Sequence, residues 1–549
     1  MKQYKDLDLG FSDAINYSKP ENKELLNRFF YKDQSLEELM NSNKYFLIGA
    51  KGTGKTALAV YLANNEYKNT YSSINYIKET EYVKFINLKR LHNLQLSDYT
   101  NVWKVLIMLL MSKEVEHGEA ILSQLKNFSE FECLRKAVDE FYKRAFSPEI
   151  VTAFNIVEES YQAVKAFSEV FELDGSNSIS ESKEGKSFQL NLLSLENYFK
   201  KGLGGLKLTK NHILFIDGID IRPRNIEYEE YLECVRGLAN ALWELNTGFF
   251  SKIKGRKSTQ GRLRIVVLLR PDIFSHLGLQ NLNTKIRDNG VLLNWNTKYD
   301  SYKTSPLYAL TNRMLEVQQD SEDLQKDCWE YYFPYGVKNL WRTSTFSTEE
   351  SLDPSFVSFL RFSWSRPRDI VSIMKIVQDK ITKSPDNTKM QVSVADFDDS
   401  LVRLEISNYL LGEIKDYLSF YHSDSDYELF LKFFTFLDGK QEFSYDDYIN
   451  AYEKLAVYIE SNNIQVPVLF ETSGNFLQFL YDLDVICYLQ ETLDGQQRFW
   501  HWSYRERSYA NVNPKVVEGV DYRIHNGLRS VLSVGKRCKT RSIKKVKNL

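Results

Sequence analysis

One glycine-rich segment of this sequence has residue types and a spacing that indicate chemistry directly. Residues 49–56 read GAKGTGKT and match the pattern G-x-x-x-x-G-K-[ST] at every fixed position. Its three glycines allow backbone N–H groups to close around an anion, and the N-terminus of a following helix adds partial positive charge. The predicted contacts with a triphosphate nucleotide are Gly49, Gly52, Thr53, Gly54, Lys55, Thr56 and Ala57. Lys55 is expected to reach the β- and γ-phosphates and to act in catalysis, while the Thr56 hydroxyl is expected to ligate Mg²⁺.

A loop of this kind needs an acidic partner that holds the magnesium ion from a second strand. The apolar run HILFID at 212–217 ends on Asp217, which we predict to be that metal ligand. We expect its strand to lie adjacent to the strand that precedes the loop. Asp220 follows three residues later, where a carboxylate can orient or deprotonate the attacking water. The alternative role for Asp220 is the N-cap of the next helix. The two patterns together predict ATP and Mg²⁺ as cofactors.

Four arginines are candidates for contact with the γ-phosphate. The strand RLRIVVLLR ends at Arg270, and its guanidinium is expected to emerge at the same edge of the sheet as the phosphates. Arg287, in NTKIRDN, is a candidate for a finger that reaches a neighbouring subunit. In SRPRDIVSIMK, Arg366 and Arg368 precede an amphipathic helix, and Arg368 is our choice for a sensor in a lid over the nucleotide. The alternative roles are a surface ion pair for Arg270 and a capping charge for Arg368.

The elements that must position these residues alternate between strand and helix. The expected strands are 44–48, 81–88, 212–217 and 262–270. The runs at 212–217 and 262–270 are almost continuously apolar, which is typical of central parallel strands covered on both faces. Helical patterns follow the glycine-rich loop and Asp220. This order predicts an α/β fold with a doubly wound, mostly parallel sheet, as in a P-loop NTPase.

The pattern along the chain divides it into five predicted parts. They are an N-terminal helical segment at 1–40, a P-loop ATPase core at 41–300, a helical lid at 301–410, a winged-helix-like domain at 411–535 and a basic tail at 536–549. The core contains a large helical insertion at about 95–208. Inside this insertion, the polar stretch at 172–188 is expected to be a mobile loop.

The order of elements near the C-terminus resembles a winged helix. Three helical patterns, at 426–437, 445–459 and 473–485, precede two strands around Asp494 and Gly495, a pair that favours a hairpin turn. Such folds bind DNA or serve as protein docking modules. The last fifteen residues hold seven Lys or Arg and no acid. This tail is suited either to contact with nucleic-acid phosphates or to a solvated terminus.

Composition excludes several classes of protein. The chain has 549 residues, 43% of them apolar, and a net charge of −2. No apolar run approaches the roughly 18 residues that suggest a membrane span, and the first residues lack the apolar region of a signal peptide. The five cysteines are scattered without a CxxC pair, which disfavours a zinc site and a disulfide framework. We therefore expect a cytoplasmic protein without a membrane partner.

The loop GAKGTGKT, the strand ends ILFIDGID and LLRPDIF, and the segment RPRDI together resemble the P-loop ATPases allied to the STAND and origin-initiator (AAA+-like) groups. The DGxD form is similar to that of NACHT-type NTPases. The spacing of LLRPDIF, NTKIRDNGVLLNW, RPRDI and YRIHNGLRSVL further resembles a bacterial family of P-loop ATPases often encountered near phage-defence genes. This second resemblance covers nearly the whole chain.

The resemblance implies an oligomeric, ATP-driven molecular switch. Nucleotide exchange and hydrolysis would reposition the lid and the winged helix and so change contacts with other subunits or with a protein partner or effector. A role in antiviral defence is implied by the family alone. The STAND pattern usually places a further acid directly after the second aspartate, where this chain has Ile221. That departure implies slow hydrolysis.

Three alternative functions stay open at this point. Residues 297–300 read TKYD and fit the T-K-x-D pattern of guanine recognition, although a D-x-x-G element is missing after the strand that ends at Asp217. The second alternative is an ATP-dependent DNA-binding loader or remodeller that uses the winged helix and the basic tail. The third is an interaction scaffold that binds nucleotide without turnover, which Ile221 motivates.

Overall fold

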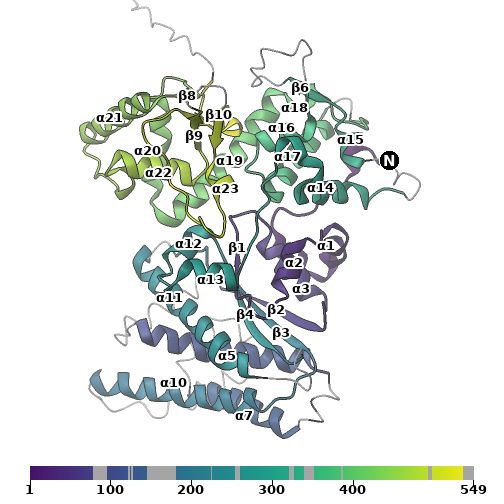
Figure 1. The fold of residues 1–549 in the computed structure, drawn as a ribbon, viewed down its shortest axis with the longest axis vertical. Helices are drawn as coiled ribbons and strands as arrows, with labels where there is room; N and C mark the ends of the chain where they lie inside the picture. Colours follow the sequence, from purple (N-terminus) through teal and green to yellow (C-terminus); the bar gives the residue numbers. More distant parts are fainter. Residues whose placement is uncertain are drawn as a thin grey trace, which may run out of the picture. The chain divides into compact units, whose positions relative to one another are not determined.

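The structure is a computed structural model in which two compact units are described separately. It describes residues 1–77, 96–120, 124, 126, 128–144, 181–223, 226–253, 260–320, 327–338, 352–384, 387–492 and 498–535. Asp13–Asn294 make up the parallel-sheet unit, and Met1–Ser12 together with Trp295–Leu549 make up the discontinuous unit (Figure 1). The chain therefore leaves the discontinuous unit after Ser12 and returns to it at Trp295.

Among the described residues, a five-stranded parallel sheet forms the centre of the parallel-sheet unit. Its strands are β1 (Phe46–Ile48), β2 (Thr70–Tyr76), β3 (Asn211–Asp217), β4 (Leu263–Leu269) and β5 (Gly290–Leu292), in the spatial order β2-β3-β4-β1-β5. All four neighbouring pairs are parallel. β4 is buried throughout and β3 is buried after its first residue, as expected for apolar strands covered on both faces. The predicted α/β class with a parallel sheet is confirmed.

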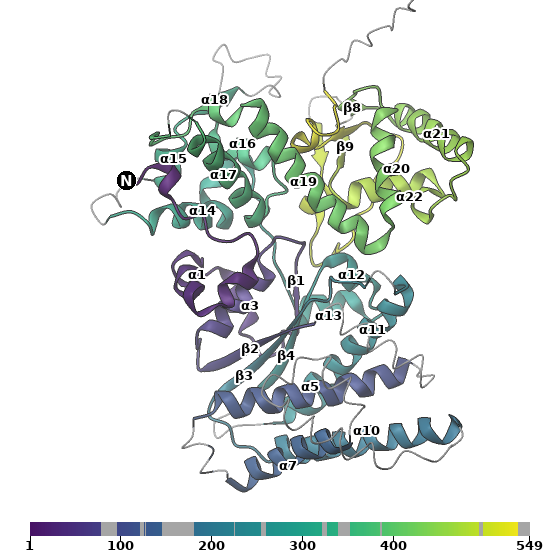
Figure 2. The ribbon, with the colours of Figure 1, turned by 180° about the vertical axis from the view of Figure 1, so that it is seen from behind.

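Helices cover both faces of this sheet (Figures 1 and 2). On one face lies α3 (Lys55–Asn64), together with α1 (Lys23–Phe29) and α2 (Gln34–Leu39). The other face carries α11 (Tyr228–Glu244), α12 (Pro271–His276) and α5 (Leu96–Gly118). Successive residues of a strand point to opposite faces. Leu47 accordingly joins the core under α3, whereas Phe46 makes an edge contact with Phe274 of α12.

Between β2 and β3 in the chain, the described residues include three long helices. α5, α7 (Phe128–Arg144) and α10 (Glu181–Gly204) run side by side, as Figure 2 shows. The predicted helical insertion is therefore present. The prediction of a loop across 172–188 was wrong for its second half, because α10 begins at Glu181. Its later turns bury Leu195 and Phe199, and helix propagation beyond such a packed segment adds one hydrogen bond for each residue fixed. Residues 172–180 and the strand predicted at 81–88 lie outside the described residues.

The first part of the discontinuous unit is mainly helical. Its elements are α14 (Pro306–Glu316), α15 (Cys328–Tyr332), α16 (Ser355–Arg361), α17 (Pro367–Thr382), α18 (Val394–Phe397) and α19 (Ser400–Tyr421), with a small pair of strands, β6 (Gly336–Lys338) and β7 (Leu352–Pro354). The first residues of the chain pack here as well. Tyr4 is fully buried, and its hydroxyl donates to the carbonyl of Met374 at 3.0 Å.

In the described residues, the second part of this unit combines four α-helices with a small antiparallel sheet. The helices are α20 (Asp424–Thr435), α21 (Tyr445–Ser461), α22 (Ser473–Asp482) and the short α23 (Ser503–Glu506). The strands are β8 (Glu442–Phe443), β9 (Ile486–Glu491), β10 (Arg498–His501) and β11 (Tyr522–Ile524), in the order β10-β9-β11-β8. The three predicted helices and two predicted strands are confirmed as elements. Asp494 and Gly495, between β9 and β10, lie outside the described residues.

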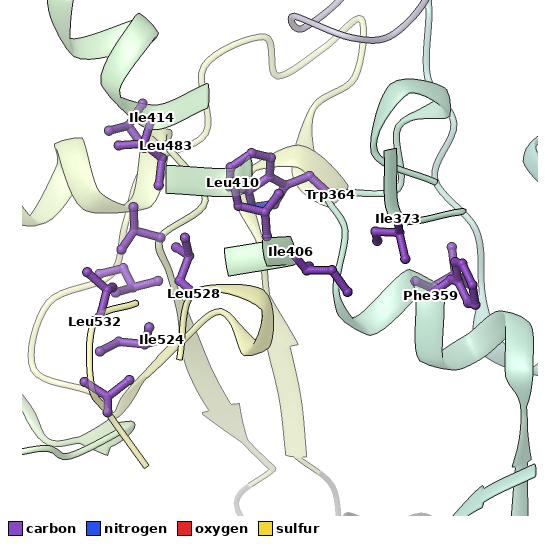
Figure 3. Packing of buried hydrophobic residues seen from close by; sticks show 14 of the residues in the cluster. Phe359, Trp364, Ile373, Ile406, Leu410, Ile414, Leu483, Ile524, Leu528 and Leu532 are labelled. Carbon is purple, nitrogen blue, oxygen red and sulfur yellow. The ribbon is translucent and has the colours of Figure 1, made fainter. Parts of the chain in front are cut away.

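One apolar core runs through both parts of the discontinuous unit. Figure 3 shows Phe359 and Ile373 at one end, Trp364 beside Leu410 of α19 in the middle, and Ile524 and Leu532 at the other end. α19 is a continuous helix through the boundary predicted at residue 410. Both parts therefore belong to one packed body. None of the described helices combines the length and the apolar character that a membrane crossing requires.

Candidate functional site

The loop at residues 49–54 connects β1 to the first turn of α3. Gly52 and Gly54 have φ of 84° and 92°, a region that glycine adopts without steric cost. A Cβ on Gly49 would lie 2.4 Å from Thr53 Oγ1, so a side chain there would displace Thr53. Thr53 in turn donates from Oγ1 to the carbonyl of Ala50 at 2.8 Å. The glycines are therefore needed for the shape of this loop.

Lys55 folds back over the loop instead of extending into solvent. Its Nζ donates to the carbonyl of Gly49 at 2.8 Å and to that of Ala50 at 3.2 Å. The residue is 8% exposed. Lys55 is also the first residue of α3, where the N–H groups of the first turn have no partner within the helix. Ammonium and helix N-terminus together make this end of α3 electropositive.

Thr56 and Asp217 meet directly, although they are far apart in the sequence. Thr56 Oγ1 donates to Asp217 Oδ2 at 2.7 Å, and the N–H of Gly218 donates to Asp217 Oδ1 at 2.8 Å. The expectation that their strands are adjacent was wrong, since β4 lies between β1 and β3. The contact still forms because Thr56 sits one residue inside α3, beyond the end of β1, and so reaches across the end of β4.

Burial raises the pKa of Asp217, whereas its hydrogen bonds lower it. Burial raises its pKa, and the charge of Asp220 raises it further. The hydrogen bonds from Thr56 and Gly218 and the charge of Lys55 lower the pKa, but burial prevails. A bound cation would remove this penalty by compensating the buried carboxylate.

The donor set at this position fits magnesium. A hydroxyl and a carboxylate oxygen are hard ligands, and Mg²⁺ in nucleotide sites takes one or two carboxylates besides phosphate oxygens and waters. In the described part of the chain, no group of three or more His, Cys, Asp or Glu is arranged to hold a metal. Thr56 and Asp217 would therefore share the ion with the oxygens of a ligand.

Asp220 lies in a tight turn directly after β3. The turn is held from α11, because the Tyr231 hydroxyl donates to the carbonyl of Ile219. The charge of Asp220 reaches Asp217, as its effect on that pKa shows. α11 begins at Tyr228 with Glu227 as its N-cap residue, so Asp220 is not the N-cap of that helix. That Asp220 orients or deprotonates an attacking water stays a prediction.

Arg270 follows the last residue of β4, the strand between β1 and β3. The carbonyl of Leu269 accepts from the N–H of Gly49 at 3.1 Å, so Arg270 begins next to the first residue of the loop. Its guanidinium pairs with Asp272 through Nη2 at 2.7 Å and is 4% exposed. Arg270 is therefore a buried, paired arginine, and not the surface ion pair of the alternative reading.

The other candidate arginines occupy different surroundings. Arg287 is exposed on α13 (Leu282–Asn289). Arg366 and Arg368 belong to the discontinuous unit. Arg366 donates to both oxygens of Asp369 and is almost buried, whereas the Arg368 guanidinium is 25% exposed and 3.7 Å from Glu413. Contact of any of these three with a phosphate stays a prediction.

Two residues near the site were not found by sequence reasoning. Tyr76, the last residue of β2, pairs with Asp217 in the sheet, and burial raises its pKa to about 12. Asp272 holds Arg270 by two hydrogen bonds. An acid two residues after the strand-end arginine was the available signal for Asp272. Tyr76 had no such signal, because its strand was not predicted.

Comparison of the chain with protein-family models and with curated proteins found no match in either case. The residues and their geometry therefore have to carry the functional assignment.

Proposed function

We propose that this chain is a P-loop ATPase that binds Mg-ATP at residues 49–56 and hydrolyses it slowly as a molecular switch. The observation that carries the proposal is the 2.7 Å hydrogen bond from Thr56 to Asp217. It joins the two groups that hold magnesium in P-loop sites, one from the loop and one from a separate strand end. A glycine turn without this function would not need a buried carboxylate beside it.

The chain's own residues divide the chemistry among them. Lys55 and the N–H groups at the start of α3 would bind the β- and γ-phosphates, while Thr56 and Asp217 would hold the metal. When bound, Mg²⁺ neutralises charge that develops on the phosphates. Asp220 would orient the attacking water and accept its proton. Arg270, at the end of β4, would contact the γ-phosphate.

Adenine is the proposed base, although the TKYD segment leaves guanine as an alternative. Thr297 is buried, and its hydroxyl donates to the carbonyl of Trp295 at 3.0 Å. Asp300 lies in η6 (Tyr299–Thr304) of the discontinuous unit. The segment thus follows β5 by several residues, and the Thr297 hydroxyl already has an acceptor within the protein.

Thermal unfolding of the full chain with Mg-ATP, Mg-ADP or Mg-GTP tests both points. Ligands that bind the folded state raise the free energy of unfolding by mass action, by about 2.7 kcal/mol at a hundredfold excess over Kd, and the melting temperature rises with it. We expect ATP and ADP to raise it in wild type and not in Lys55→Ala. A larger shift with GTP than with ATP would replace adenine with guanine. No shift with any nucleotide would remove the proposal.

The switch would act through the discontinuous unit. Its single core includes α17, which follows Arg366 and contains Arg368, and the winged-helix-like part, so nucleotide state would move both as one body. We propose that this movement changes contacts within a homo-oligomer and with a protein partner in the cytoplasm, and a role in antiphage defence belongs to the same proposal. Affinity purification of Lys55→Ala and Asp220→Asn should retain different partner proteins. Identical partners would contradict a nucleotide-gated switch.

Charge weighs against the alternative of a DNA loader. In a helix-turn-helix, the second helix enters the major groove, and here that position belongs to α22. α22 has no Lys or Arg, and α20, α21 and α22 together hold eight acidic residues and two lysines. Such a surface repels phosphates. The basic tail at 536–549 lies outside the described residues. A mobility shift that weakens steeply with added salt would restore the DNA reading.

A further inference from the structure

The chain returns to the discontinuous unit from a position beside the glycine-rich loop. It passes from one unit to the other between Asn294 and Trp295. Leu293, just before this point, is 6% exposed in the core under α3, and its N–H donates to the carbonyl of Ile48 at 2.8 Å. A Cβ on Gly49 would lie 3.2 Å from Leu293 Cβ. Leu293 therefore packs directly against the first residue of the loop.

The other end of this connection is fixed to α23 within the discontinuous unit. Trp295 packs against the core of that unit. Asn296 Nδ2 donates to the carbonyls of Tyr504 and Arg505 at 3.1 and 3.2 Å. These carbonyls lie in the last turn of α23, where a helix leaves its carbonyls without an internal partner. Only two residues separate this attachment from the one at Leu293.

α23 is in turn joined to the segment that precedes α17. The N–H of Tyr504 donates to Asp484 Oδ1 at 2.9 Å, and Trp364 Nε1 donates to the carbonyl of Asp484 at 3.2 Å. Asp484, between α22 and β9, is buried. Buried hydrogen bonds of this kind fix geometry, because leaving one partner unpaired costs free energy. The connection is thus bonded, through Tyr504 and Asp484, to both parts of the discontinuous unit.

We propose that the connection at residues 293–296 carries the nucleotide state of the loop to α23, and that Asn296 is the positioning residue that fixes it there. This inference rests on the proposed function. A change of the loop on phosphate binding would move Leu293, because close-packed groups transmit a displacement. The two residues that follow have few soft dihedral angles with which to absorb it. The displacement would therefore reach the hydrogen bonds of Asn296 and, through α23, the rest of the unit.

Hydrogen exchange of the full chain with Mg-ADP and with Mg-AMP-PNP tests the proposal. The readout is the exchange rate of the peptide that contains α23, in which the amides of Glu506 and Arg507 donate to carbonyls at the start of the helix. In wild type, we expect this rate to differ about fivefold or more between the two nucleotides, which is the lower end of typical coupling between two sites.

A Gly-Ser-Gly-Ser insertion between Asn294 and Trp295 adds slack to the connection and should abolish this difference. The matched control is the same insertion between Ser12 and Asp13, the other point at which the chain passes between the units. This control should keep the difference. Both variants should bind each nucleotide with a Kd within about twofold of wild type, because neither insertion changes a residue of the proposed site.

Asn296→Ala tests the positioning residue without lengthening the chain. It removes the two hydrogen bonds to α23 and should reduce the difference in exchange to less than about twofold, while both Kd values stay as in wild type. Asn296→Asp keeps the size of the side chain but not its N–H donors, and it should behave as Asn296→Ala does. Asn450→Ala, at an exposed position of α21, should leave the difference unchanged. An unfolding temperature near that of wild type shows that each variant is folded.

Three results would overturn the inference: no difference between the nucleotides at α23 in wild type, a difference that survives the insertion after Asn294, or an equal loss with both insertions. Faster exchange with both nucleotides in Asn296→Ala, at an unchanged ratio, would overturn the role of Asn296, since it would show a structural contact only. Absence of binding of either nucleotide by wild type would instead remove the proposed function, so the two failures are distinguishable.

Discussion

Asp217 is buried, whereas its proposed role as a magnesium ligand requires it to be ionised. Burial and the neighbouring charge of Asp220 raise its pKa above that of an ordinary aspartate. The folded state therefore favours the protonated form, and the ionised carboxylate costs stability at neutral pH. That cost disappears as the pH falls through the raised pKa. The proposed metal binding would follow the opposite trend, because a protonated carboxyl is a poor magnesium ligand.

Asp217→Asn should consequently raise stability and abolish metal-dependent binding at once. Without nucleotide, we expect a higher melting temperature than wild type at neutral pH, and a difference that shrinks as the pH falls toward the ordinary pKa of an aspartate. With Mg-ATP, the shift that depends on magnesium should be lost. Differential scanning calorimetry across a series of pH values measures the first effect, and titration with and without EDTA measures the second. A variant less stable than wild type at neutral pH would contradict the assigned electrostatics.

Asp220→Asn should separate turnover from binding. A general base contributes a factor of about 10²–10⁴, so we expect phosphate release to fall about a hundredfold. The Kd for Mg-ATP should change by less than about threefold, because the amide keeps the size of the carboxylate. Single-turnover phosphate release and a binding titration give the two values. Equal rates in wild type and Asp220→Asn would remove the catalytic assignment.

At the scale of elements, the turn after β3 positions both acids. Gly218 has φ of 93°, and a Cβ there would lie 2.3 Å from the carbonyl oxygen of Ile77, at the end of β2. The N–H of Ile77 donates to the carbonyl of Asp217 at 2.9 Å. Because the obstructing atom belongs to the backbone, no side chain can move aside to make room. The turn that carries Asp217 and Asp220 therefore requires glycine.

Gly218→Ala should destabilise the parallel-sheet unit by about 2 kcal/mol or more, from the strained φ and the close contact. Mg-ATP affinity should fall with it, since Asp217 and Asp220 flank the turn. Gly248→Ala is the matched control, because a Cβ at Gly248 has no atom within 4 Å. Urea unfolding of both variants measures the difference. Equal stability of the two would show that the turn tolerates a side chain.

Sequence reasoning found the elements with strong local signals. β3 and β4 were predicted because buried parallel strands are continuously apolar, and the contact between Thr56 and Asp217 was expected from two short motifs. β2, with the sequence TYSSINY, was missed because this edge strand is only partly buried and has no apolar run. The position of β4 between β1 and β3 was also missed, since neighbourhood in a sheet is set by tertiary packing. Asp272 depends on how β4 turns into α12.

At the scale of the whole molecule, the first residues of the chain complete a unit formed mostly by its second half. Tyr4 is fully buried against α17, and Gln378 of that helix donates to the carbonyls of Tyr4, Lys5 and Leu7. Gln318, two residues after the end of α14, donates to the carbonyl of Asp8 at 2.8 Å. These contacts make residues 1–12 a structural part of the discontinuous unit.

Tyr4→Ala should destabilise the discontinuous unit by about 3–5 kcal/mol, the cost of removing a large buried aromatic side chain. Nucleotide affinity should change little, because the proposed site belongs to the parallel-sheet unit. Ile15→Ala removes a side chain at a position 46% exposed and serves as control. Denaturant unfolding and Mg-ATP titration of the full chain give both values. A loss of affinity as large as the loss of stability would contradict this separation.

The chain leaves the discontinuous unit after Ser12 and returns to it at Trp295. The polypeptide therefore connects the two units at two points. During synthesis on the ribosome, Tyr4 emerges early but its pocket is completed only after α17 has been translated. The parallel-sheet unit can therefore finish folding before residues 1–12 are able to pack against α17. Both ends of the parallel-sheet unit are thus tethered to the discontinuous unit, so neither unit can rotate freely about a single linker.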